Sequence, residues 1–188
     1  MNMNDINSKP TIVVDLDDTL VHVTPILPKD SDKSNYFTIV VKRRKLYVQM
    51  RPNLQAFLDK LSKLFNIYVF TASEKSYANK IIDKILPNVK NCCRFFKDSC
   101  INLYGYFVKD LEVIQTPLHQ TLLLDDTAGS AIKNPKNLIK IKPWNGEKDD
   151  DILTSLLSVL ENIAFSEDLR QSFIEIMKKE IYEGFGTF

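Results

Sequence analysis

The sequence predicts an α/β fold with a mainly parallel sheet flanked by helices. Three features support this: short apolar runs at residues 11–14, 67–70 and 121–124, helical periodicity between them, and polar residues where each run ends. A continuous apolar run indicates a strand covered on both faces, which is typical of a parallel sheet. Because strands and helices alternate and the chain has 188 residues, we expect one principal domain.

The first half of the chain supplies a strand, a helix and a second strand, with an insert between them. Thr11–Val14 is the first strand, and residues 36–50 form a β-hairpin around the basic connection Lys42–Lys45. Pro52 suits the first turn of a helix, whose apolar positions continue at helical spacing to residue 65. The apolar run 67–70 is the second buried strand.

The second half repeats this alternation. In chain order it predicts a helix from about Glu74 to Pro87, short strands at 93–96 and 106–108, a buried strand at 121–124, an outer strand at 138–141, and helices beginning near Asp149 and Leu169, the last ending at Gly184 and Gly186. We expect the acidic run Asp149–Asp151 to be a solvated turn whose negative charge favours the start of its helix.

Composition excludes several classes of function. Lys and Arg total 25 against 24 Asp and Glu, a balance that argues against direct nucleic-acid binding. No apolar run approaches the roughly 18 residues of a membrane helix, so we expect no membrane partner. Three cysteines without a C-x-x-C pair indicate reduced thiols and an intracellular, nuclear or cytoplasmic protein. Five glycines cannot be arranged as a nucleotide-binding loop here, and two isolated histidines do not suggest a zinc site.

Polar side chains cluster where the predicted strands end. Asp15 and Asp17 follow the first strand, Thr71 follows the second, Lys109 follows the strand at 106–108, and the pair Asp125–Asp126 follows the strand at 121–124. Ligands of open α/β sheets bind at the carboxyl edge of the strands. Carboxylates so close together repel one another unless a cation lies between them, and an all-oxygen site favours Mg²⁺.

The motifs at these positions resemble those of a known enzyme superfamily. Residues 12–22, IVVDLDDTLVH, are similar to the first motif of haloacid-dehalogenase (HAD) phosphatases, and more narrowly to the FCP/SCP-like phosphatases of the RNA polymerase II C-terminal domain (CTD), small CTD phosphatase type. The similarity covers about residues 10–163 and continues through Met50-Arg51-Pro52, Phe70-Thr71-Ala72-Ser73, Tyr77-Ala78, Phe107–Leu111, Leu124-Asp125-Asp126 and Pro143-Trp144. The resemblance implies a HAD-like, Rossmann-like fold.

The resemblance also implies catalytic roles. Asp15 is expected to be the nucleophile that takes the phosphoryl group as an aspartyl-phosphate, and Asp17 the general acid and then the base. Thr71 is expected to donate its hydroxyl to a phosphoryl oxygen. Lys109 is expected to neutralise charge on Asp15 and on the transferring group.

The same resemblance implies the metal and substrate contacts. Mg²⁺ is expected on Asp15, on the backbone carbonyl of Asp17 and on Asp126, with Asp125 in a supporting position that orients Lys109 or bound water. The residues expected to contact substrate are Thr19, Ser73, Tyr77 and Lys97. For Tyr77, a purely structural place in the core is an equally good interpretation.

The spacing of the motifs leaves no room for a cap domain. Between the first motif and the helix at Pro52 only about Thr24 to Met50 remain, which is the size of a hairpin. We therefore expect an open site that admits a phosphorylated side chain on a protein. Aromatic residues of the insert (Tyr36, Phe37, Tyr47) suit a groove for an extended, proline-containing peptide. The resemblance implies that the leading substrate is phosphoserine in the RNA polymerase II C-terminal domain.

Alternatives remain at this stage. The chain is either such a phosphatase, one that acts on another phosphoprotein such as a signalling factor or a membrane-lipid regulator, or a non-catalytic peptide-binding relative. Glu74 and Lys97 depart from the family pattern, which typically has a larger apolar residue and an Arg there. The basic run Lys42–Lys45 is either a solvated tip that prevents edge pairing or a docking site for an acidic phosphopeptide.

The domain boundaries follow from the extent of the motifs. Residues 1–9 form a polar arm, 10–164 the phosphatase domain, and 165–188 an amphipathic helix and tail. That last helix either docks on the domain or mediates self-association, and the oligomeric state stays open.

Overall fold

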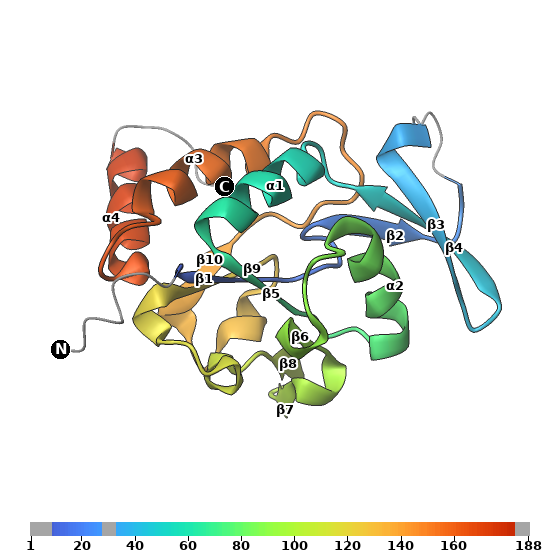
Figure 1. Cartoon of the computed structure of the whole chain (residues 1–188), viewed down its shortest axis with the longest axis horizontal. Coiled ribbons are helices and arrows are strands. Elements are labelled where there is room, and N and C mark those ends of the chain that lie inside the picture. Colours follow the sequence, from blue (N-terminus) through green and yellow to red (C-terminus); the bar gives the residue numbers. More distant parts are fainter. Residues whose placement is uncertain (1–8, 28–32, 183–188) are drawn as a thin grey trace.

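The computed structural model describes residues 9–27 and 33–182 and is built around a five-stranded parallel sheet (Figure 1). Its spatial order is β10-β9-β1-β5-β6, with every neighbouring pair parallel. The bounds are β1 Thr11–Val14, β5 Asn66–Phe70, β6 Arg94–Phe95, β9 Thr121–Asp125 and β10 Leu138–Lys140. The predicted α/β fold is confirmed, including the outer position of the strand near residue 138.

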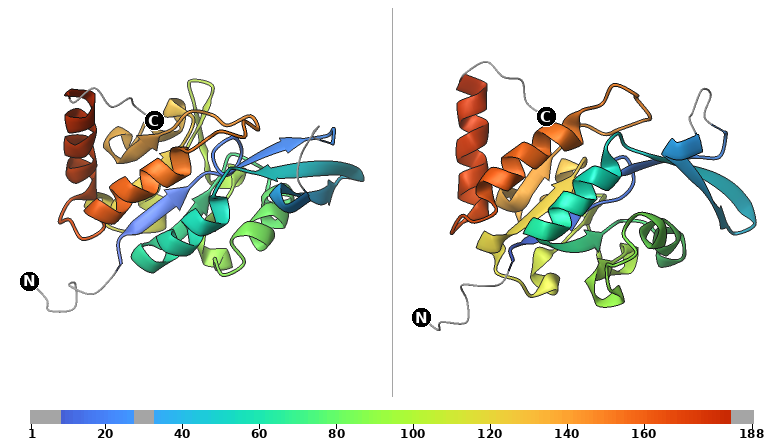
Figure 2. Two further views of the ribbon diagram at one scale, coloured as in Figure 1. Left: turned by 90° about the horizontal axis from the view of Figure 1, so that it is seen from above. Right: turned by 45° about the horizontal axis from the view of Figure 1, so that its top comes forward.

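Alternation along the central strand divides the core between the two faces of the sheet. Ile12 and Val14 point into the larger apolar cluster, whereas Val13 points into a smaller one on the opposite face. The larger cluster is covered by α1 (Leu54–Leu64), α2 (Lys75–Ile85) and α3 (Ile152–Ile163). The smaller is covered by short 3₁₀ turns, among them η4 (Leu111–Ile114) and η6 (Ala128–Ala131). Figure 2 shows α1 (teal) and α3 (orange) lying along the sheet. Both faces are covered, which explains the uninterrupted apolar runs.

The insert after β1 is larger than the predicted hairpin. It is an antiparallel sheet of three strands in the order β2-β4-β3, with β2 at Val21–Thr24, β3 at Tyr36–Val41 and β4 at Arg44–Met50. The predicted pair is present as β3 and β4, but β2 pairs along the other side of β4. A second hairpin joins β7 (Ile101–Leu103) to β8 (Tyr106–Val108). The described residues contain no cap domain over the carboxyl edge.

One sequence interpretation is wrong. The run Asp149–Asp151 is not simply a solvated turn, because Asp150 forms a two-pronged ion pair with the fully buried Arg51. Arg51 also donates to the backbone carbonyls of Thr19 and Lys142. This pair fastens the start of α3 to the segment between β4 and α1.

The last helix, α4 (Leu169–Tyr182), packs against α3. Asp168 accepts hydrogen bonds from the backbone N–H groups of Arg170 and Gln171, as a helix cap does. Leu169 is fully buried in the main core. Except for Lys9, the predicted polar arm lies outside the described residues, as do Gly184 and Gly186. Among the described residues, no helix is both long and apolar enough to cross a bilayer.

Candidate active site

Three neighbouring strands end at one edge of the sheet and bring Asp15, Thr71 and the pair Asp125–Asp126 there. Val14 of β1 is level with Val69 of β5 and Leu124 of β9, so the residues that follow each strand emerge together. The backbone continues this register beyond β1, because the Asp15 N–H donates to the carbonyl of Leu124 at 3.0 Å. Thr71 follows β5 and is likewise anchored, by its N–H to Phe95.

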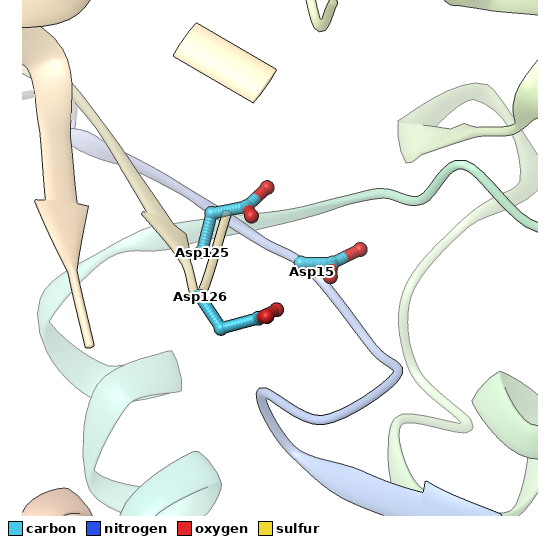
Figure 3. Close-up of side chains that lie close together, drawn as sticks. All are labelled: Asp15, Asp125 and Asp126. Atoms are coloured by element: carbon cyan, nitrogen blue, oxygen red, sulfur yellow. The ribbon is translucent and has the colours of Figure 1, made fainter. Parts of the chain in front are cut away.

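The structure brings three carboxylates together at this edge (Figure 3). One oxygen from each of Asp15, Asp125 and Asp126 lies within 4.8 Å of the others, and all three side chains point to the same side. Thr19 fixes Asp126 twice: its hydroxyl donates to Oδ1 and accepts from the Asp126 N–H, both at 3.1 Å. Thr19 itself is fully buried. Both hydrogen bonds of its hydroxyl in the described structure are with Asp126.

Lys109 supplies the positive charge of the site. Its Nζ lies 2.7 Å from Oδ1 of Asp15 and 2.6 Å from Oδ2 of Asp125, and its side chain is 3% exposed. Its backbone N–H donates to the carbonyl of Ser130, which fixes the chain directly after β8. Although burial favours the neutral amine, the two carboxylates outweigh it and raise the pKa of Lys109 to about 12. The lysine is therefore a permanent cation between the two acids.

The negative charge of the three carboxylates exceeds the positive charge that Lys109 supplies. Burial, opposed by Lys109 but reinforced by Asp125 and Asp17, raises the pKa of Asp15 to about 7. Burial and the charge of Asp125 also raise the pKa of Asp126. Three acids share one ammonium here, and all offer oxygen. This donor set and its unbalanced charge fit a hard divalent cation such as Mg²⁺.

Asp17 is held by the loop after β5 and by α2. Its Oδ2 accepts a 2.6 Å hydrogen bond from the Ser73 hydroxyl, and its Oδ1 accepts one from the phenol of Tyr77. Burial, followed by the charge of Asp17, raises the pKa of Tyr77, which keeps the phenol a proton donor. Ser73 and Tyr77, predicted to touch substrate, hold Asp17 here. Tyr77 is thus more than a core aromatic, although it also packs against the main core.

The remaining predicted residues occupy two different positions. Thr71 is 1% exposed at the end of β5, and its hydroxyl accepts from the Ser73 N–H at 3.1 Å. Lys97 is not brought to the carboxylates: its ammonium lies over the ring of Phe107, 4.9 Å from the centroid. Its backbone N–H nevertheless donates to the carbonyl of Ser73, so Lys97 borders the same loop.

Two supporting groups escaped the sequence reasoning. Ser130 holds the backbone of Lys109, but it lies 21 positions later and on no recognised motif. Arg51 supports the Thr19 carbonyl from the buried interior. Its signal was present in Met50-Arg51-Pro52, since an Arg between two apolar residues needs a partner when it is buried.

The sequence profile of the family described as NLI interacting factor-like phosphatase matches residues 10–170. The chain belongs to this family. A relative from Caenorhabditis elegans named CTD small phosphatase-like protein 3 is 36% identical over 165 residues, covering 86% of this chain and 57% of the relative. CTD nuclear envelope phosphatase 1 from Xenopus laevis is 30% identical, covering 86% of this chain and 70% of its own length. The chain thus spans little more than half of the Caenorhabditis elegans protein.

Solved structures of Fcp1 share the fold. The fission yeast RNA polymerase II CTD phosphatase Fcp1, bound to beryllium fluoride, matches with a TM-score of 0.58 at 17% identity, covering 96% of this chain and 57% of that one. The predicted FCP/SCP-like family and its α/β fold are both confirmed.

Proposed function

We propose that this family member is a Mg²⁺-dependent protein serine/threonine phosphatase that works through an aspartyl-phosphate on Asp15. The observation that carries the proposal is the contact between Asp15 and Lys109, 2.7 Å apart at an edge of the sheet that no described cap covers. Asp17 lies two residues from the nucleophile and is held by two hydroxyls. Nucleophile, fixed cation and second acid are the parts that phosphoryl transfer requires.

The first step transfers the phosphoryl group to the enzyme. An oxygen of Asp15 forms a bond to phosphorus as the bond to the serine or threonine oxygen breaks, and Asp17 gives that oxygen its proton. Lys109 stays protonated and faces the negative charge that spreads over the phosphoryl oxygens. The hydroxyl of Thr71 is a further donor at this edge.

The second step restores the enzyme. Asp17, now ionised, removes a proton from water as the water oxygen attacks phosphorus, and the bond between Asp15 and phosphorus breaks. Phosphate leaves and Asp15 is a carboxylate again. The hydroxyls of Ser73 and Tyr77 orient Asp17 in both steps. We therefore propose that these two residues act on the substrate through Asp17 and do not contact it directly.

We assign three groups to Mg²⁺: side-chain oxygens of Asp15 and Asp126, and the backbone carbonyl of Asp17. When bound, the ion supplies charge neutralisation between the carboxylates and the phosphoryl group. Asp125 belongs to the same acidic cluster, but one of its oxygens is paired with Lys109. We therefore assign Asp125 the supporting position beside the ion, where it orients the lysine.

Phosphoserine of the RNA polymerase II C-terminal domain is the leading substrate. The names of the relatives support it, and so does the edge without a described cap. In the insert, the rings of Tyr36 and Tyr47 pack edge-to-face, with centroids 6.0 Å apart. A second candidate is another phosphoprotein. It is favoured by Glu74, which forms an ion pair with Lys42 where the family pattern has an apolar residue. The nuclear or cytoplasmic location stays a prediction.

The test measures phosphate release from p-nitrophenyl phosphate and from a phospho-Ser-Pro heptad peptide, with Mg²⁺ or with EDTA. Wild type is compared with Asp15→Asn and with Asp59→Asn, a control at an exposed position of α1. We expect Mg²⁺-dependent turnover that Asp15→Asn abolishes and Asp59→Asn retains. A folded wild type that binds the peptide and releases no phosphate would instead be a binding module.

A further inference from the structure

The turn between β3 and β4 concentrates positive charge. Lys42, Arg43, Arg44 and Lys45 follow one another at the tip and are all exposed. Among the described residues, Lys42 alone of the four has a carboxylate partner, Glu74, and Lys45 lies over the ring of Tyr47. Neither arginine has a carboxylate partner in the described part of the chain, and both residues are exposed.

The conformation of this turn is unfavourable for the residues that occupy it. Lys42 has φ 49° and Arg43 has φ 66°, both in the left-handed region. Two-residue turns of this kind favour Asn-Gly, because residues with larger side chains are strained there. If the sequence only needed a tight turn, or a charge to prevent edge pairing, a less strained sequence with one lysine would suffice.

An exposed ion pair also links the tip to the loop beside the candidate active site. The ion pair between Lys42 and Glu74, 3.1 Å long, joins the turn to the loop after β5. The next residue back in that loop, Ser73, donates to Asp17. Figure 1 shows the β3–β4 hairpin extending past α2, which begins at this loop. An anion held at the tip would therefore be linked, through Lys42 and Glu74, to the loop that holds Asp17.

We propose that the β3–β4 turn is a docking site for acidic side chains of the substrate, so that the enzyme selects phosphopeptides carrying further negative charges outside the cleaved residue. This inference rests on the proposed function. Arginine binds carboxylates and phosphates through paired hydrogen bonds, which suits both kinds of acidic side chain. A protein segment fits better than a membrane surface, because the basic run Lys42–Lys45 includes no apolar side chain to enter a bilayer.

The experiment compares two synthetic peptides with the same central phospho-Ser-Pro, one with neutral flanks and one with Asp and Glu on both sides. At low salt we expect wild type to favour the acidic peptide by about tenfold in kcat/KM, mainly through KM, and this preference to fall as salt rises. The variant Lys42→Asn/Arg43→Gly relieves the backbone strain of the turn and removes two positive charges. Its preference should fall to about threefold or less, while its Tm rises by a few degrees.

A matched control removes two exposed cations elsewhere. Lys63→Gln/Lys84→Gln alters the last turns of α1 and α2 and should keep the full preference. Equal kcat/KM for both peptides in wild type, or an unchanged preference in the turn variant, would overturn the inference. The inference would also be overturned if the turn variant lost the binding of wild type to phosphatidylserine vesicles while its peptide kinetics stayed unchanged. If wild type cleaves neither peptide, the proposed function fails, and fluorescence anisotropy of the labelled acidic peptide still tests docking by its Kd.

Discussion

The buried ion pair between Arg51 and Asp150 offers the sharpest test of what holds the site in place. Arg51 is 1% exposed and makes four hydrogen bonds: two to Asp150 at 2.8 Å and one each to the carbonyls of Thr19 and Lys142. Arg51→Met fills the space but provides no N–H donor. The substitution leaves the Asp150 carboxylate, which is 9% exposed, and the two carbonyls without their hydrogen-bond donor. We therefore expect a loss of about 3–5 kcal/mol in unfolding free energy.

That loss is a large share of a typical domain stability of about 5–15 kcal/mol, so urea unfolding would detect it easily. Fluorescence of Trp144, which is 3% exposed, reports the transition. Arg51→Lys keeps the charge but not the fork and should lose less, whereas Lys63→Met on the surface should stay within about 0.5 kcal/mol. Combining Arg51→Met with Asp150→Leu should recover stability relative to the sum of the single losses. A loss below about 1 kcal/mol for Arg51→Met would refute the reasoning.

Three further predictions concern the site and the last helix. Lys109→Met should lower kcat for p-nitrophenyl phosphate by about 10²–10³, because it removes the fixed cation; a change below about tenfold would contradict that role. Gly129→Ala would place a Cβ 2.1 Å from the ring of Tyr106, so urea unfolding should show a loss of about 1–3 kcal/mol that Tyr106→Ala largely restores. Bonds to Arg170 and to helix N–H groups lower the pKa of Asp168 from 3.8 to about 2, so its stabilisation is present above pH 4 and is lost as the pH falls towards 2. Because a third of that side chain is exposed, Asp168→Asn should remove no more than about 1 kcal/mol, and unfolding curves from pH 2 to 7 would show it.

Local patterns were sufficient to predict the sheet and the edge where the site lies. The apolar run of β1 predicted a strand buried on both faces, and the polar residues at the ends of β1, β5 and β9 predicted the edge where the acidic cluster lies. The short strands β2 and β7 were missed because four or three residues carry too little periodicity to separate a strand from a loop. The buried Asp150 was missed because its partner lies 99 positions away, and no local pattern distinguishes it from its solvated neighbour Asp149.

The contacts of the site residues also depend on tertiary structure. Sequence placed Ser73 and Tyr77 near the substrate, and the structure shows that both hydroxyls bind Asp17. Thr19 follows Asp17 by two positions but turns inward to hold Asp126, 107 positions later. Side chains of one motif thus serve different partners, because the tight loop after β1 turns them in different directions.

The electrostatics of the site explain why the fold fixes each member so firmly. Asp15, Asp125 and Asp126 repel one another, and one lysine offsets part of their charge. Unless other contacts held them, these acids would move apart towards solvent. The parallel strands and the hydrogen bonds of Lys109 and Thr19 prevent this, so the excess negative charge is retained where a divalent cation can neutralise it. The same charge would repel a phosphate group in the absence of the ion. We therefore expect binding of cation and substrate to be coupled, with the protein supplying the geometry and the cation completing the charge balance.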